Sequence, residues 1–301
     1  MRKILLTGKH GQVGWELQRT LMPLGQVIAL DAKALDLAQP DAIRKTLQSL
    51  RPDIIVNPAA YTAVDKAEAE PDLAMAINAV APGILAEEAR KLGALLVHYS
   101  TEYIFDGRKQ GAYVEEDAAN PLNIYGKSKL AGEQAIHATG CNHLILRTSW
   151  VYGARGSNFL LTMLRLAQER PELRVVSDQI GAPTWCRSLA EVTALILAQL
   201  YAPKAAGDAI ARASGTYHVT SSGSVSWHGF ASEILRLSAM QQTPAVVAIT
   251  SADYPTPARR PMNSVLSGDK LFNTFGVTAG NWHDNLQLCL QEVRQHQELT
   301  E

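Results

Sequence analysis

The sequence predicts an α/β fold: a doubly wound parallel sheet with a smaller C-terminal α/β lobe. Short apolar runs alternate with helical patterns through the first half of the chain. These runs are continuous rather than alternating with polar residues, which is typical of strands buried on both faces. A glycine-rich turn separates the first run from the first helical pattern. Alternating strands and helices imply parallel strands joined by right-handed crossovers.

Each element follows from its own pattern. In the first half, apolar runs predict strands at 3–7, 26–31, 52–57, 93–100 and 143–149. Helical periodicity predicts helices at 11–22, 42–50, 123–134 and, for most of its length, 65–92. After Ser149 strands and helices no longer alternate regularly. Helices are expected at 156–169, 188–201, 227–240 and 281–296. Strands are expected at 172–178, 214–222 and 244–254. We therefore divide the chain into a sheet domain at 1–150, with later crossover segments allowed, and a second lobe at 151–301.

Composition and charge exclude several classes of protein. The formal net charge of -1 gives no electrostatic basis for binding nucleic acid or a membrane surface. No stretch approaches the roughly 20 apolar residues of a membrane span, and the N-terminal apolar run is too short for a signal peptide. The cysteines Cys141, Cys186 and Cys289 are widely separated and odd in number, which fits a reducing compartment. We expect a cytoplasmic protein.

The glycine-rich turn "TGKHGQVG" predicts a dinucleotide site. Glycine lets a backbone approach a ligand closely, and N–H groups at a helix N-terminus attract a pyrophosphate. The spacing is G-x-x-G-x-x-G rather than the usual G-x-G-x-x-G. The position between the first strand and the first helix nevertheless favours a Rossmann-type NAD(P)-binding domain over a turn without a ligand. The expected cofactor contacts here are Gly8, His10, Gly11, Gln12, Val13 and Gly14.

Asp31 bears on whether the cofactor is NADH or NADPH. It ends the second expected strand, where a carboxylate normally accepts hydrogen bonds from the adenosine ribose. A carboxylate would repel a 2′-phosphate and so favours NADH, whereas Lys33, two residues on, could offset the repulsion for NADPH. A solvated loop acid is an equally good interpretation of Asp31. The choice between NADH and NADPH therefore stays open.

The stretch "NIYGKSKLAGEQ" carries a candidate catalytic pair. Tyr125 and Lys129 are four residues apart on an expected helix, so their side chains share one face. A nearby ammonium stabilises a phenolate and lowers its pKa from about 10, which suits a general acid. Ser100 and Thr101 end an expected strand, where a hydroxyl could polarise a carbonyl group. An ordinary amphipathic helix is the alternative, and the upstream glycine turn argues against it.

At this point the chain resembles the extended short-chain dehydrogenase/reductase superfamily and, within it, the dTDP-4-dehydrorhamnose reductases. The resemblance is carried by "TGKHGQVG", "NPAAYTAVDKAE", "STEYIFDG", "NPLNIYGKSKLAGE", "RTSWVYG", "GSNF", "DQIGAPT" and "RRPMNSVL". It implies NAD(P)H-dependent reduction of the C4 ketone of dTDP-4-dehydro-β-L-rhamnose, the last step of dTDP-rhamnose synthesis for cell-surface polysaccharide such as lipopolysaccharide O-antigen. Tyr125 would donate the proton, Lys129 would hold the nicotinamide ribose, and Thr101 would bind the ketone oxygen.

The resemblance implies further contacts on both sides of the site. On the cofactor side these are Asp36, Leu37, Ala59, Ala60, Tyr61 and Thr62. On the dTDP-sugar side they are Glu102, Trp150, Asn158, Gln179, Arg259 and Arg260, with Arg260 favoured slightly over Arg259 for the diphosphate. Helix caps remain open for Asp36 and Asn158, a cap or salt bridge for Glu102, and a role in shaping a loop for Gln179.

Assembly and alternatives follow from the same resemblance. Such proteins form homodimers helped by magnesium at acidic contacts, for which Glu16, Glu191 and Glu292 are the candidates here, although their spacing does not itself indicate a metal. One alternative function is a nucleotide-sugar epimerase or dehydratase that recycles a retained NAD. Another is the non-enzymatic regulatory subunit of methionine adenosyltransferase.

Overall fold

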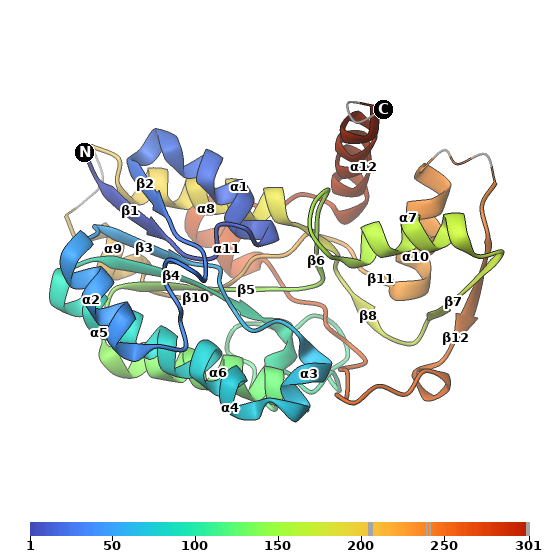
Figure 1. Ribbon diagram of the computed structural model, residues 1–301, viewed down its shortest axis with the longest axis horizontal. Coiled ribbons are helices and arrows are strands. Elements are labelled where there is room, and N and C mark those ends of the chain that lie inside the picture. The colour runs from blue at the N-terminus through green and yellow to red at the C-terminus, as the bar shows by residue number, and fades with distance from the viewer. Residues whose placement is uncertain (204–206, 239, 241, 299–301) are drawn as a thin grey trace.

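Six parallel strands form the central sheet in the computed structural model, which describes residues 1–203, 207–238, 240 and 242–298. The strands are β1 (Lys3–Leu6), β2 (Gln26–Ala29), β3 (Ile54–Asn57), β4 (Leu95–Thr101), β5 (His143–Thr148) and β10 (Gly215–His218). Their order across the sheet is β10-β5-β4-β3-β1-β2, and all neighbours are parallel (Figure 1). The chain therefore continues to one side of β1 with β2 and to the other side with β3.

Helices cover both faces of the sheet (Figure 1). One face packs against α1 (Gln12–Leu21), α8 (Cys186–Leu200) and α11 (Asp269–Phe275). The other packs against α2 (Pro40–Leu50), α5 (Ala81–Leu92) and α6 (Ile124–Thr139). Burial on both faces is the physical reason for the continuous apolar runs. The predicted doubly wound α/β fold is confirmed.

The segment expected to be mainly helical at 65–92 is helical but interrupted. It comprises α3 (Val64–Ala69), α4 (Pro71–Met75), a π-helical turn at Ala76–Val80 and then α5. Proline lacks the N–H that would continue the helix, and it disfavours helical backbone in the residue before it. Glu70, just before Pro71, accordingly leaves the helical region with φ -124° and ψ 50°.

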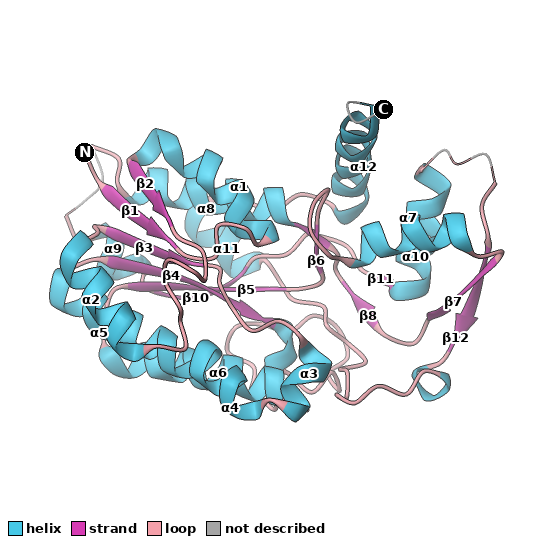
Figure 2. Cartoon of the chain, in the orientation of Figure 1, coloured by secondary structure: helices cyan, strands magenta, loops and turns pink. Residues whose placement is uncertain are grey.

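The smaller lobe lies at one end of the sheet (Figure 2). Its core joins α7 (Phe159–Glu169), α10 (Trp227–Leu237) and α12 (Trp282–Glu298) to the parallel pair β7 (Glu172–Val176) and β12 (Ala245–Ile249). Short connecting strands are β6 (Val151–Tyr152), β8 (Ile180–Gly181), β9 (Thr184–Trp185) and β11 (Val225–Ser226). Ala239, within the helix expected at 227–240, lies outside the described residues.

Several segments after residue 150 return to the sheet rather than to the lobe. The strand β10 pairs with β5, and α8 packs beside α1 (Figure 1). The short helix α9 (Ala209–Ala213) packs into the same core as α8 and α11. The remaining short helices are the 3₁₀ turns η1 (Met22–Leu24), η3 (Glu102–Ile104) and η4 (Ser251–Asp253). After residue 150 the chain therefore contributes both to the sheet and to the smaller lobe.

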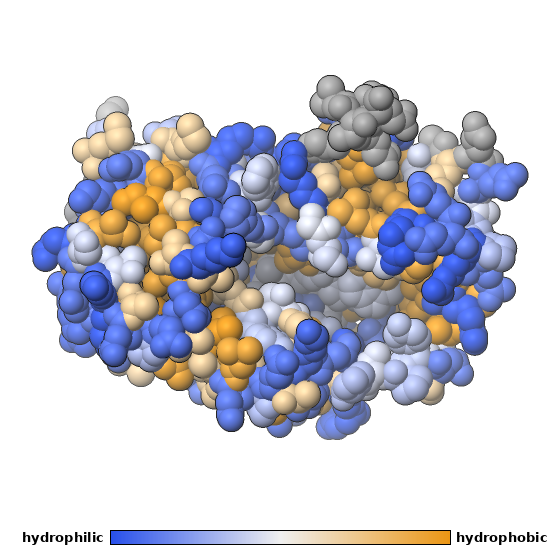
Figure 3. Space-filling model, in the orientation of Figure 1, coloured by the Kyte–Doolittle hydropathy of each residue, from blue (hydrophilic) through white to orange (hydrophobic). Residues whose placement is uncertain are grey.

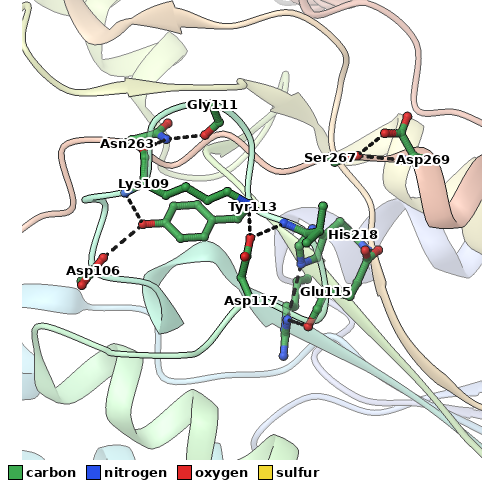
Figure 4. Close-up of polar contacts among 12 residues, drawn as sticks. Asp106, Lys109, Gly111, Tyr113, Glu115, Asp117, His218, Asn263, Ser267 and Asp269 are labelled. Carbon is green, nitrogen blue, oxygen red and sulfur yellow. Dashed lines mark hydrogen bonds and ion pairs between the residues drawn. The ribbon is translucent and has the colours of Figure 1, made fainter.

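The loop between η3 and α6 is ordered by polar contacts (Figure 4). The hydroxyl of Tyr113 donates to Asp106 and accepts from the backbone N–H of Lys109, both at 3.1 Å. Asn263, from near the end of the chain, donates to the carbonyls of Lys109 and Gly111 at 2.9 and 2.7 Å. The segment that leads into α6 is thus fastened to the C-terminal part of the chain.

A buried ion pair fixes α6 to β5. Arg147 on β5 donates to both oxygens of Glu133 on α6, at 2.7 to 3.2 Å. Both side chains are buried, and the same guanidinium donates to the carbonyl of Glu115 at 3.2 Å. Its charge therefore has partners on two other segments of the chain.

This geometry predicts a large cost for removing the arginine alone. Arg147→Met leaves the Glu133 carboxylate buried without its partner, and we expect the free energy of unfolding to fall by about 3–5 kcal/mol. Urea denaturation measures the change. Arg165→Met is the matched control, because Arg165 pairs with Glu169 on the surface of α7 and should matter little. Equal effects of the two substitutions would contradict the assignment.

Candidate active site

The crevice between β1 and β3 is the place where the strand order reverses. Open parallel sheets bind ligands beyond the carboxyl ends of their strands at such a point. The turns after the two strands meet there, since a Cβ on Gly8 would lie only 2.9 Å from the Cβ of Ala59. The surface is also hollowed between the sheet and the smaller lobe (Figure 3).

The glycine turn is built from close backbone contacts. Gly8 has a φ of 60°, in the left-handed region that favours glycine, and its carbonyl accepts from the N–H of Gly11 at 2.9 Å. Gly14, in the first turn of α1, lies so near that a Cβ there would be 2.1 Å from the same carbonyl oxygen. The turn and the start of α1 therefore form one unit, and the N-terminus of a helix is suited to bind a pyrophosphate.

Other residues of the turn make contacts that link it to its surroundings. Val13 packs against the sheet core and the lobe core together. The side-chain oxygen of Gln12 accepts from Asn158 at 3.0 Å. The turn thus contacts the smaller lobe directly.

Asp31 is surrounded by basic groups of this turn. Its carboxylate lies 3.1 Å from Lys9 Nζ and 3.3 Å from His10 Nε2. A hydrogen bond from the backbone N–H of Ala34, followed by the contact with Lys9, lowers the pKa of Asp31 to about 2. The sequence pointed to Lys33 as the offsetting cation, but the structure places Lys9 and His10 against the carboxylate. The repulsion expected for a 2′-phosphate is correspondingly reduced.

The expected adenine and ribose contacts lie on neighbouring loops. Asp36 accepts from the backbone N–H of Ala38 at 2.9 Å, in a turn before α2, and Leu37 is buried in the core. Thr62 is exposed, and Ala60 is half-buried beside Ala59. These positions are compatible with a cofactor lying along the sheet edge.

Tyr61 is held by a residue that the sequence did not single out. Asn78, buried in the π-helical turn, accepts from the backbone N–H of Tyr61 at 2.8 Å and donates to its carbonyl at 3.0 Å. It also donates to Ser128 on α6 at 3.0 Å. An asparagine inside an apolar helical stretch was the available signal. The Tyr61 hydroxyl itself donates to Glu70.

Thr101 and Tyr125 approach each other from the end of β4 and the start of α6. Asn123 caps α6 by accepting from the N–H of Gly126 at 2.8 Å, which sets where the helix begins. Burial, and then the charge of Glu102, raise the pKa of the Tyr125 phenol, while a hydrogen bond with Thr101 acts to lower it. This direction is opposite to the one expected from the Tyr125–Lys129 spacing.

Lys129 is buried and points into the sheet. Its Nζ donates to the carbonyl of Tyr99 at 2.6 Å and to His98 Nε2 at 3.1 Å. Burial lowers its pKa to about 8. The lysine therefore shares a helix face with Tyr125 but bonds to β4, which explains why it does not lower the phenol pKa here.

A chain of buried polar side chains continues from Lys129 across the sheet. The amide nitrogen of Asn57 contacts His98 Nδ1 at 3.0 Å, and its amide oxygen accepts from the Thr7 hydroxyl at 2.6 Å. These residues come from β4, β3 and the end of β1, and sequence reasoning missed them. The signal was present, because Asn57 and His98 are polar residues within apolar strands and are paired in register.

Trp150 lies in strained backbone at the junction between the sheet and the lobe. Its φ of 46° is left-handed, which is uncommon for a large side chain. Its ring stacks on Trp227 with centroids 3.5 Å apart and planes 9° from parallel. Trp227 was not predicted, because an aromatic residue opening an amphipathic helix normally indicates core packing.

Asn158 and Gln179 both make structural contacts. Asn158 caps α7, accepting from the N–H of Leu161 at 3.1 Å, so the cap that the sequence left open is the role shown. Gln179 donates to the hydroxyl of Ser251 at 2.9 Å and so contacts a loop of the lobe. Their predicted substrate contacts stay predictions.

The two arginines differ in the contacts that they make. Arg260 forms a bidentate pair with Asp65 at 2.6 and 2.8 Å, and its guanidinium is also bonded to the carbonyl of Ala258. Arg259 is exposed, and its backbone carbonyl accepts from the side-chain amide of Asn123 at 2.8 Å. Arg260 therefore joins its loop to α3, whereas Arg259 lies at the surface.

The three glutamates proposed for magnesium gather around one arginine. Arg187 bonds to Glu16 at 3.2 Å and to Glu292 at 2.7 Å, and its charge also acts on the exposed Glu191. Within the described ranges, no group of three or more suitable side chains is spaced to hold a metal ion. Within one chain, these carboxylates are arranged to bind the guanidinium of Arg187 rather than a metal ion. Magnesium stays a prediction.

The sheet, the glycine turn at its switch point and a tyrosine–lysine pair beside the same edge define a Rossmann-type NAD(P)-dependent oxidoreductase. The family model "RmlD substrate binding domain" matches residues 1–295. The dTDP-4-dehydrorhamnose reductase of Burkholderia thailandensis is 48% identical over 297 residues, covering 97% of this chain and 99% of the relative. That of Escherichia coli K12 is 45% identical over 299 residues, covering 96% and 97%. The chain belongs to the dTDP-4-dehydrorhamnose reductase family.

Solved structures agree with this assignment. The dTDP-4-dehydrorhamnose reductase of Bacillus anthracis, in complex with NADP, has a TM-score of 0.89 at 36% identity and covers 97% of this chain and 99% of its own. A UDP-glucose 4-epimerase of Thermus thermophilus in complex with NAD has a TM-score of 0.80 at 20% identity over 97% and 99% of the chains, which shows a shared fold alone. Among the described helices, none combines the length and apolarity needed to cross a membrane.

The contact between Gly14 and the Gly8 carbonyl predicts the effect of adding one methyl group. Alanine is the better helix former by about 1 kcal/mol, yet in Gly14→Ala the methyl would meet backbone, which no rotamer change can relieve. We expect the affinity for NADPH to fall about tenfold or more, measured by fluorescence titration. Gly268→Ala, where the added Cβ meets open space, is the control. Unaltered NADPH affinity in Gly14→Ala would refute the proposed cofactor site.

Proposed function

We propose that this chain reduces the C4 ketone of dTDP-4-dehydrorhamnose with NADPH or NADH, and that Tyr125 is the proton donor. The family membership supports the reaction. The observation that supports the roles is the meeting of Thr101 and Tyr125 at the carboxyl end of the sheet, one strand beyond the cofactor crevice. A ketone placed between these two hydroxyls would lie beside a nicotinamide bound along the same edge.

The pKa of Tyr125 suits a proton donor. When bound, the nicotinamide supplies the hydride for the ketone carbon. Because burial raises the pKa of Tyr125, the phenol is protonated throughout the neutral range and can give its proton to the forming alkoxide. Lys129, one helical turn along α6, would hold the nicotinamide ribose, as the family resemblance implies. Its own pKa of about 8 keeps it mostly charged at neutral pH.

For the substrate diphosphate we propose Arg259. Its guanidinium is exposed on the loop that passes over the N-cap of α6, whereas that of Arg260 is bonded to Asp65. Trp150, stacked on Trp227 at the lobe junction, is proposed to contact the sugar. Gln179 and Asn158 would support this surface from behind.

A second function within the same fold is a nucleotide-sugar epimerase or dehydratase. Such enzymes regenerate their cofactor, whereas a reductase consumes one NAD(P)H for each ketone. Loss of nicotinamide absorbance in step with product therefore separates the two classes. A purely regulatory subunit would show neither reaction.

The compartment and the assembly also belong to this proposal. The three cysteines are free and buried, which suits a reducing cytoplasm. A homodimer is proposed from the resemblance to family members. Its test is the mass of the protein in solution, with and without magnesium.

Tyr125→Phe tests the proton donor. The substitution removes the phenolic hydroxyl and little else, so we expect kcat to fall about a hundredfold or more. Cofactor affinity should be largely kept, because the glycine turn is untouched. Reduction of the 4-keto-6-deoxy sugar nucleotide is followed by nicotinamide absorbance, and NADPH binding by fluorescence. Turnover at the wild-type rate would exclude Tyr125 as the donor.

The two arginines give a contrasting pair of variants. Arg259→Ala should raise KM for the dTDP-sugar about tenfold or more while leaving the melting temperature unchanged. Arg260→Ala should instead lower the melting temperature, since it leaves Asp65 without its bidentate partner. Steady-state kinetics and thermal denaturation of both variants test the assignment. A larger KM effect from Arg260→Ala at unchanged stability would restore the preference expected from the sequence.

A further inference from the structure

The hydroxyl of Thr101 has two possible acceptors, the Glu102 carboxyl and the substrate ketone. Its Oγ1 donates to Glu102 at 2.8 Å, while the backbone N–H of Tyr103 donates to the same oxygen at 3.2 Å. The proposed mechanism also requires Thr101 to donate to the ketone oxygen. A threonine hydroxyl has a single proton, so it cannot serve an ionised Glu102 and the ketone together.

Glu102 is enclosed by the same residues that shape the site. Its side chain is 4% exposed. The backbone of Trp150, whose φ is 46°, also acts on the carboxyl through a hydrogen bond. The ionisable side chains that face it are the phenols of Tyr103 and Tyr125, with Arg260 and Asp65 behind Tyr103. No cation is in direct contact with the carboxyl among the described residues.

From this geometry we propose that Glu102 works as a protonated acid and is the positioning residue for Thr101. When neutral, Glu102 has a proton of its own and can donate it to Oγ1 of Thr101. The threonine proton is then free to point at the ketone. When Glu102 ionises, it captures that proton, and the ketone loses its donor. The inference rests on the proposed ketone reduction and extends it to a residue that acts only through Thr101.

The surroundings of Glu102 favour the protonated form near neutral pH. Burial raises the pKa of this carboxyl to about 7, against the opposing hydrogen bonds. Below this pH the acid is neutral and Thr101 is free, and above it the carboxylate holds the threonine proton. The rate should therefore be high on the acid side and fall as the pH rises. Loss of charge on Lys129, near pH 8, adds a separate decline.

The test is the pH profile of kcat for ketone reduction with saturating NADPH and dTDP-ketosugar, from about pH 6 to about pH 9. For the wild type we expect a decline that begins near pH 7 and approaches tenfold per unit. Glu102→Gln, which is neutral at every pH and has an N–H to donate, should be active and lack this decline. It should keep only the one that begins near pH 8.

Two further variants isolate the effect. Glu115→Gln is the matched control, because Glu115 is a half-buried glutamate whose pKa is also raised by burial but which bonds to His218 in another part of the fold (Figure 4). It should retain the decline near pH 7. Thr101→Val removes the group through which Glu102 acts, so its residual rate should lack that decline. This second variant keeps the test decisive if Glu102→Gln fails to fold.

The outcomes distinguish a failure of the role proposed for Glu102 from a failure of the proposed ketone reduction. An unchanged decline near pH 7 in Glu102→Gln or in Thr101→Val would overturn the role of Glu102. So would a folded, NADPH-binding Glu102→Gln that is inactive at every pH, since the neutral isostere would then have failed. If the wild type itself did not consume NADPH with the ketosugar, the proposed function would be wrong, and the role of Glu102 in it would fall too.

Discussion

The ammonium of Lys129 is buried, and the protein must keep a charge satisfied where water does not reach it. An uncompensated charge in such a place is costly, so its hydrogen bonds to Tyr99 and His98 constrain the surrounding backbone. Through Asn57 and Thr7 the same polar chain extends across β4 and β3 to the residue before Gly8. The start of the glycine turn and the helix of Tyr125 are thereby held by one continuous set of contacts.

A second constraint joins the smaller lobe to this frame. The segment before α11 is fastened by Arg260 to Asp65, by the Arg259 carbonyl to Asn123, and by Asn263 to the loop that precedes α6. Asn123 is also the N-cap of α6. The loop that carries Arg259 is therefore bonded to the same residue that begins the helix of Tyr125, and the proposed diphosphate contact and proton donor are held by one asparagine.

The sheet could be predicted because each central strand is buried on both faces. A strand buried in this way consists of consecutive apolar residues. The sequence also predicted the glycine turn, Thr101, Tyr125 and Lys129 from local patterns and from resemblance. What it could not supply depends on long-range contacts. The Arg260–Asp65 pair joins residues 195 positions apart, and nothing local distinguishes Arg260 from Arg259. Two-residue strands such as β8 have no period to detect. Spacing placed Lys129 on the face of Tyr125, but the carbonyl of Tyr99 decides where its ammonium points.

The stacked indoles of Trp150 and Trp227 give this enzyme an optical property of its own. Two identical chromophores with centroids 3.5 Å apart and nearly parallel planes couple their electronic transitions. One indole follows the last strand of the first half and the other opens α10 of the lobe. We therefore expect the far-ultraviolet circular dichroism to contain a coupled indole signal whose strength depends on how the two parts pack together. Movement at this junction can then be followed without any added label.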